Sequence, residues 1–175
     1  SGQKRAEAAL RASEARFQAA AESLPDGMAI FDAEDRIVFY NSRHPEHLPP
    51  ALREALRPGV RFEDFIREGS ARGPVYHPDM GEGYAERRLA ARREGRLEHE
   101  HKHADGRWVR VREGRMPDGG RVLLTTDVTE ARRQRRALAA QTRKLEAVLA
   151  NIAEGVSIVD GEGRVVLVND GFLGL

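Results

Sequence analysis

The chain of 175 residues carries 29 basic and 28 acidic side chains, and its formal net charge of +1 argues against a dedicated nucleic-acid or membrane-surface protein. It contains no cysteine, which excludes disulfides, thiolate metal sites and cysteine nucleophiles from this sequence. No apolar run reaches the roughly 20 residues of a membrane span and no signal peptide is visible, so we expect a cytoplasmic location and no membrane contact by this region.

The first predicted element is a long helix over residues 1–24. Leu10, Phe17 and Leu24 recur at intervals of seven, which is typical of a coiled-coil stripe. Alanine is frequent between them and favours helix, and Pro25 ends the pattern.

A β-hairpin is expected next. Two short β-prone runs, 28–31 and 37–40, are joined by a tight acidic connection. Residues 43–58 contain four prolines, which favour irregular structure that could include one helical turn.

Two short helices are then predicted. Phe62 begins the first, which Gly69 should end. The second covers 82–94, with Tyr84 and Leu89 facing inward and many arginines facing solvent.

Three antiparallel strands should follow, over 97–104, 107–113 and 122–128. The Asp105-Gly106 pair between the first two is a strong hairpin signal. A second long helix follows to residue 152. Strands joined by hairpins, with the helices clustered between them, indicate an α+β fold with helices on one face of the sheet.

The chain repeats itself at a distance of 128 residues. Segment 27–41 returns without a gap as 155–169, and seven of the fifteen positions are identical. This spacing is the size of a domain rather than of a solenoid repeat. We therefore expect a fragment of a longer protein with an N-terminal helix at 1–24, a complete domain at 25–128, a signalling helix at 129–152 and the truncated start of a second domain at 153–175.

Two sequence segments resemble the PAS family of bacterial sensor domains. LPDGMAIFDAEDRIVFYN is similar to the opening of a PAS domain, and HADGRWVRVREGRMPDGGRVLLTTDVTE is similar to its closing strands. The resemblance covers residues 17–130, and the opening recurs at 145–170. It implies a five-stranded antiparallel sheet of order 2-1-5-4-3, flanked by long N- and C-terminal helices.

The resemblance also implies a pocket and a coupling motif. Asp127 and Thr129 match the motif that joins the last strand to the exit helix, where they could cap the helix and also couple core strain to it. The pocket residues could line a ligand site or simply fill the core. These pocket candidates are Phe62, Phe65, Ile66, Tyr84, Leu89, Val109 and Val111.

The two long helices carry apolar stripes in the same phase. We expect a parallel homodimer through them, although the stripes could instead pack on their own domain. The many arginines of the second helix are interpreted as a solvated face, so no nucleic-acid partner is expected. The stripe residues are Leu10, Phe17, Leu138, Leu145, Leu149 and Ile152.

His99, His101 and His103 alternate, so on a strand all three point the same way. Residues two apart on a strand lie nearly 7 Å apart, as follows from the rise of about 3.3 Å per residue, which is wide for ligands of one small ion. We expect no metal site and a solvated, pH-sensitive strand face. His44 and His47 are assigned to loops.

No cofactor is expected. A cysteinyl-flavin is excluded because there is no cysteine, and haem is not expected because the helix at 82–94 contains no histidine. An unidentified small ligand could still occupy the pocket, and a flavin could be held without a covalent bond. No catalytic motif is present, so this region is not expected to be an enzyme.

The expected function is a regulatory sensor and signal-relay module. A sensor histidine kinase of a two-component system is the favoured parent, with a C-terminal output domain beyond this sequence. The alternatives are the sensory region of a diguanylate cyclase or phosphodiesterase, and that of a DNA-binding transcription regulator.

Overall fold

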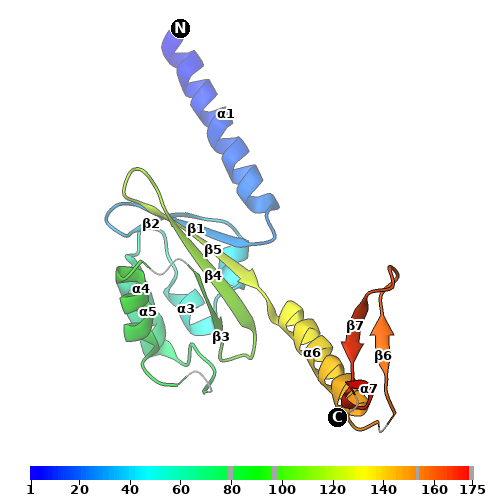
Figure 1. Ribbon diagram of the computed structural model, residues 1–175. Helices are drawn as coiled ribbons and strands as arrows, with labels where there is room; N and C mark the ends of the chain where they lie inside the picture. Colours follow the sequence, from blue (N-terminus) through cyan, green and yellow to red (C-terminus); the bar gives the residue numbers. More distant parts are fainter. Residues whose placement is uncertain (79–80, 96–97, 153, 174–175) are drawn as a thin grey trace. The chain divides into compact units, whose positions relative to one another are not determined.

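A five-stranded antiparallel sheet is the centre of the computed structural model, which describes residues 1–78, 81–95, 98–152 and 154–173. The strand order β2-β1-β5-β4-β3 confirms the order that the family resemblance implies. Figure 1 shows this sheet with its helices. The strands are β1 (Gly27–Phe31), β2 (Ile37–Tyr40), β3 (Glu98–Lys102), β4 (Trp108–Arg115) and β5 (Arg121–Asp127).

The strands lie close to the expected positions because their side chains alternate between core and surface. In β1 the residues Gly27, Ala29 and Phe31 are buried and the two between them are half-buried. Strand β4 ends two residues later than expected, since its pairing with β5 continues to Arg115. The predicted start of β3 at residue 97 lies outside the described residues.

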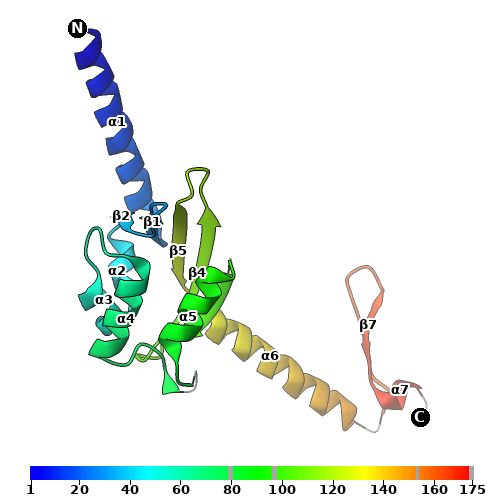
Figure 2. The same cartoon turned by 90° about the vertical axis from the view of Figure 1, so that its left-hand side faces the viewer.

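The helices that cover the sheet differ from the prediction in two places. The segment 43–58 contains two short helices where at most one helical turn was expected. In the second of them Pro50 occupies the first turn, where proline is tolerated. Helix α4 continues past Gly69, whose missing Cβ lets Leu52 approach closely. Figure 2 shows these helices on one side of the sheet. The elements are α2 (Arg43–Glu46), α3 (Pro50–Ala55), α4 (Phe62–Arg72) and α5 (Tyr84–Arg93).

The N-terminal helix α1 (Gly2–Ser23) is joined to the sheet through its last turns. Phe17 contacts Phe39 edge-to-face at 5.1 Å between ring centroids. The carboxylate of Glu22 accepts a hydrogen bond of 3.0 Å from the backbone N–H of Ser42. These contacts fix the end of the helix against β2 and the segment after it.

Asn41, which is identical in both copies of the repeat, is buried and links several elements through its side chain. The side-chain oxygen of Asn41 accepts hydrogen bonds from the backbone N–H groups of Met28 (2.8 Å) and His44 (3.1 Å). Its amide donates to the carbonyls of Ala21 (2.8 Å) and Asp26 (3.0 Å). One side chain therefore ties the helix end, the first strand and α2 together.

The second copy repeats this arrangement. The side-chain oxygen of Asn169 accepts from Val156 (2.8 Å) and Phe172 (3.1 Å), and its amide donates to the carbonyls of Leu149 (3.0 Å) and Glu154 (2.9 Å). Each partner lies 128 residues after its counterpart. The elements of this unit, residues 130–175, are α6 (Thr129–Ala150, which starts one residue before it), β6 (Ser157–Val159), β7 (Val165–Val168) and α7 (Asp170–Leu173).

Local hydrogen bonding and packing also explain why Asp32 and Gly27 recur in the second copy. The carboxylate of Asp32 accepts from the N–H groups of Glu34 (3.0 Å) and Arg36 (2.9 Å), and Asp160 makes the equivalent pair at 2.9 Å each. A Cβ at Gly27 would lie 2.8 Å from the Cα atom of His44, and one at Gly155 would lie 2.9 Å from the Cα atom of the equivalent Phe172. The repeat therefore preserves the residues that close the hairpin.

Among the helices in the described part of the chain, none is long and apolar enough to cross a membrane.

Candidate functional site

A cavity of about 40 Å³ lies between the sheet and the helices. The apolar wall comes from α4, with Phe62, Phe65 and Ile66, and from β4, with Val109 and Val111. Tyr84 at the start of α5 also contributes, so the structure brings together all the predicted pocket residues except Leu89. Leu89 is buried in the hydrophobic core and is not among the described residues that line the cavity.

The histidine strand faces this cavity, which corrects the prediction of a solvated strand face. His101 and His103 are buried and line the cavity, while His99 is half-buried and stacks on His101. The inner side of β3 is covered because Tyr76 lies against His101, with 4.7 Å between ring centroids. The less polar face of the strand is therefore the inner one.

The two imidazoles also approach more closely than the strand spacing suggests. The Nε2 atoms of His101 and His103 are 2.9 Å apart, because the rings converge although their Cα atoms are separated along the strand. This distance is that of a hydrogen bond between two neutral rings, in which one nitrogen donates and the other accepts.

Two more histidines reach the cavity from the segment that the sequence analysis assigned to a loop. His44 lies in α2 and is buried. His47 follows α2, and its Nδ1 lies 2.8 Å from the carbonyl oxygen of Thr125 on β5. A carbonyl can only accept, so Nδ1 of His47 carries the proton. The sequence signal was weak, since both residues stand among prolines.

Burial keeps His44, His101 and His103 neutral. It lowers the pKa of His101 to about 2, with neighbouring His103 adding to the effect. It likewise lowers the pKa of His103 to about 4, helped by Arg107, and the pKa of His44 to about 4, helped by His47. Burial also raises the pKa of Tyr84 to about 12. These groups are therefore uncharged at neutral pH.

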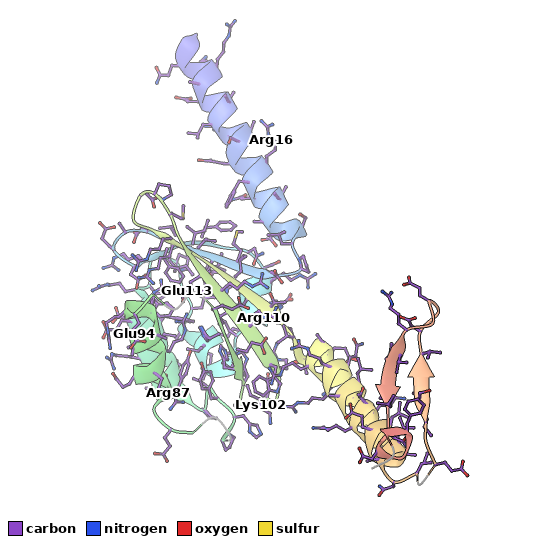
Figure 3. All side chains as sticks on the ribbon, viewed as in Figure 1. Arg16, Arg87, Glu94, Lys102, Arg110 and Glu113 are labelled. Atoms are coloured by element: carbon purple, nitrogen blue, oxygen red, sulfur yellow. The ribbon has the colours of Figure 1, made fainter. Side chains whose placement is uncertain are left out.

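Two arginines of α5, Arg87 and Arg93, are exposed as expected, but the other two face inward. Arg88 and Arg92 are buried one turn apart, and both pair with Glu113, a buried residue of β4 that Figure 3 labels. Arg92 also stacks on Phe62, at 3.7 Å from the ring centroid. Helix α5 has few large apolar residues, so paired arginines fill its inner face.

Glu113 is shared by three cations. Arg92 approaches it at 3.2 Å and Arg121 at 3.4 Å, while Arg88 forms the shortest contact. Burial alone would raise the pKa of this carboxyl, but the two α5 arginines outweigh burial and hold the pKa below its usual value. Arg92 is also paired with Asp35, at the turn between β1 and β2.

The predicted coupling residues lie where β5 meets α6. The carboxylate of Asp127 accepts a 2.9 Å hydrogen bond from the N–H of Thr129, the first residue of the helix. The hydroxyl oxygen of Thr129 accepts a 2.9 Å hydrogen bond from the N–H of Trp108 on β4. The start of the helix is therefore tied to β4 and β5, two of the strands that carry cavity residues.

The stripe residues of the long helices fall into two groups. Leu10, Phe17, Leu138 and Leu145 are between 44% and 65% exposed, and Ile152 is 37% exposed. Leu149 is buried within its own unit, and its backbone carbonyl accepts a hydrogen bond from the side chain of Asn169. Its side chain is therefore not available to a partner helix. For this residue the alternative of packing on its own domain is correct.

No three histidine, aspartate or glutamate side chains in the described part of the chain are placed to hold a metal ion.

Comparison with known families places PAS sequences in both parts of the chain. A family model described as a PAS fold matches residues 21–136, and a second, described as a PAS domain, matches residues 143–175. A curated relative, the "Non-motile and phage-resistance protein" of Caulobacter vibrioides, is 24% identical over 151 residues. That match covers 84% of this chain and 16% of the relative, so the chain spans only a small part of that protein.

Several solved structures are similar to this chain. An RNA-binding light-oxygen-voltage receptor is 15% identical with a TM-score of 0.42, covering 74% of this chain and 37% of its own. The PAS domain of an HTR-like protein from Haloarcula marismortui is 20% identical with a TM-score of 0.34, covering 71% and 98%. The phage VqmA–DPO complex is 20% identical with a TM-score of 0.36, covering 81% and 63%.

Proposed function

The chain belongs to the PAS family, and we propose that it is the sensing and relay module of a bacterial sensor histidine kinase. The observation that carries the relay proposal is the hydrogen-bonded junction of Trp108, Asp127 and Thr129. Strands β4 and β5 line the cavity through Val109 and Thr125, close to the strand ends that hold Thr129, the first residue of α6. A shift of either strand would change how the helix starts.

Loss of the junction should disturb the relay without unfolding the domain. Thr129→Val removes the hydroxyl oxygen that accepts a hydrogen bond from the N–H of Trp108. The free energy that this hydrogen bond contributes is about 1 kcal/mol. If the junction separates two signalling states, basal output of the full-length protein should change about fivefold. Output is measured as the autophosphorylation rate, and Thr129→Ser, which keeps the hydroxyl, is the matched control.

The same measurement can contradict the proposal. An unchanged basal rate in Thr129→Val, in protein that melts like the wild type, would show that the junction does not set the output. The kinase assignment is tested separately by the gene sequence after residue 175. A cyclase, phosphodiesterase or helix-turn-helix sequence there would replace the kinase with one of those outputs and leave the relay proposal standing.

We also propose that the module acts as a parallel homodimer through α1 and α6. The exposed stripe residues recur at the same 128-residue offset, Leu10 with Leu138 and Phe17 with Leu145. Exposed apolar residues at heptad spacing are buried efficiently by a second copy of the same helix.

Charges placed in this stripe should dissociate the dimer. Leu138→Glu with Leu145→Glu puts two carboxylates into each helix of the seam, and at tens of micromolar protein the mass from light scattering should fall to that of a monomer. The control is Ala140→Glu with Ala147→Glu, which adds the same charge at exposed positions off the stripe. An unchanged dimer in the leucine variant would exclude α6 from the interface.

A further inference from the structure

The cavity has a polar corner whose hydrogen-bonding groups are not paired within the protein. Arg88 lines the cavity and is buried, and its Nη1 atom has no hydrogen-bond partner among the described residues. The same holds for Nδ1 of His44, His101 and His103. A buried polar group without a partner costs about 1–3 kcal/mol, so several in one small cavity indicate a complementary molecule.

The charge of this corner favours an anion. Among the described residues, the network around Glu113 contains three guanidinium groups and two carboxylates, which leaves one positive charge in excess. Its members are the buried Arg88, Arg92 and Glu113, together with Arg121 (22% exposed) and Asp35 (38% exposed). Arg88 lies close enough to His101 to depress its protonation. The same field would repel a metal cation, for which the described residues also offer no set of three ligands.

The histidine pair adds a donor to the arginine. In the contact between Nε2 of His101 and Nε2 of His103, one neutral ring must accept, so that ring carries its proton on Nδ1. This Nδ1–H is buried without a partner whichever of the two rings it belongs to. An arginine N–H and an imidazole N–H together suit the two oxygens of a carboxylate.

The size and the opposite wall of the cavity restrict the rest of the ligand. A volume of about 40 Å³ corresponds to roughly three water-sized spheres, far below the pockets of about 300–1,000 Å³ that hold drug-sized ligands. Phe62, Phe65, Ile66 and Val111 form an apolar wall suited to a short hydrocarbon tail.

We propose that the cavity binds a short monocarboxylate anion of about two to four carbons, with its carboxylate on Arg88 and the His101–His103 pair and its alkyl group against α4. This inference rests on the proposed sensing function and names the chemical class of the ligand. The signal would start at the histidines at the end of β3, which bind the carboxylate, and at β4, whose valines line the cavity, and pass to the junction at Thr129.

The test is isothermal titration of the 175-residue chain with sodium propionate and with its neutral isostere propionamide. We expect saturable binding of propionate at concentrations up to about 10 mM, and at least about tenfold weaker binding of the amide, because the amide lacks the charge that pairs with Arg88. Zinc sulfate is titrated in parallel. Absence of propionate binding, equal binding of the amide, or binding of zinc alone would each overturn the proposal.

Variants locate the site. Val111→Met fills the cavity without changing a charge and should weaken propionate binding at least about tenfold. The double variant Arg88→Met with Glu113→Gln removes the guanidinium together with its buried counter-charge and should do the same. Arg93→Gln, an exposed arginine of the same helix, is the matched control.

These results separate the ligand from the relay. Wild-type affinity in Val111→Met, with thermal unfolding showing a folded protein, would place propionate outside the cavity and overturn the proposal. Failure of propionate to bind would leave the Thr129→Val experiment untouched. Conversely, a Thr129→Val variant with normal output would refute the relay while the binding measurement still stood.

Discussion

Replacing Glu113 with alanine is expected to lower the free energy of unfolding by about 3–5 kcal/mol. The substitution removes the carboxylate that Arg88, Arg92 and Arg121 share. The side chains of Arg88 and Arg92 are 5% and 4% exposed, so their charges would remain in a medium that solvates them poorly. Arg92 keeps its contact with Asp35, but Arg88 would lose its carboxylate partner.

The measurement is urea unfolding at pH 7.5, followed by the fluorescence of Trp108. This is the single tryptophan of the chain and lies in β4, so it reports on the domain that contains Glu113. Glu98→Ala is the control, because Glu98 pairs with Arg110 and Arg112 while 56% exposed and should change stability by less than about 1 kcal/mol. A loss below about 1 kcal/mol for Glu113→Ala would show that the buried network contributes little to the fold.

The local features of this fold could be predicted because they depend on neighbouring residues. The Asp105-Gly106 turn and the alternation of β4 predict a hairpin without knowledge of the rest of the chain. The repeat also marked Asn41 and Gly27 as special, and the structure supplies the reason, since both close the junction between helix and hairpin. The strand order required the family resemblance, because pairing of β1 with β5 is a long-range contact.

The inward arginines could not be predicted from local pattern. Charged residues are rarely buried unless paired, and the partner that buries Arg88 is Glu113, 25 residues away on another element. The inward orientation of the histidines could have been predicted from the sequence. In β3 the alternate residues Glu98, Glu100 and Lys102 are charged, which leaves the histidines as the less polar face. The strand spacing was correct for Cα atoms but did not describe where the ring nitrogens lie.

Acidification is expected to destabilise the domain between about pH 6.5 and pH 4. The pKa values of His44, His101 and His103 are about 4, 2 and 4 in the folded state, against an ordinary value of 6.5. Below pH 6.5 the unfolded chain therefore binds protons that the folded chain excludes, so stability is fully present above pH 6.5 and falls with decreasing pH.

Each of these histidines should remove about 2 kcal/mol between pH 7.5 and pH 5, or about 6 kcal/mol for the three. This is comparable to the whole stability of a typical domain, about 5–15 kcal/mol. The carboxyls of Glu113 and Asp127, whose pKa values lie below their usual range, add to the loss only at lower pH. The window from pH 6.5 to 5 therefore isolates the histidines.

Urea unfolding of the wild type at pH 7.5, 6.5, 5.5 and 5 measures this slope, again through Trp108 fluorescence. His103→Asn should reduce the loss of stability between pH 7.5 and 5 by about 2 kcal/mol. The variant lacks one of the imidazoles that bind a proton in the unfolded chain but not in the folded one. Val109→Ala, at a buried apolar position in the same cavity, should lower stability by the same amount at every pH. A wild-type stability that stays constant from pH 7.5 to 5 would show that the histidines accept protons in the folded state, and the cavity would then open to water in that range.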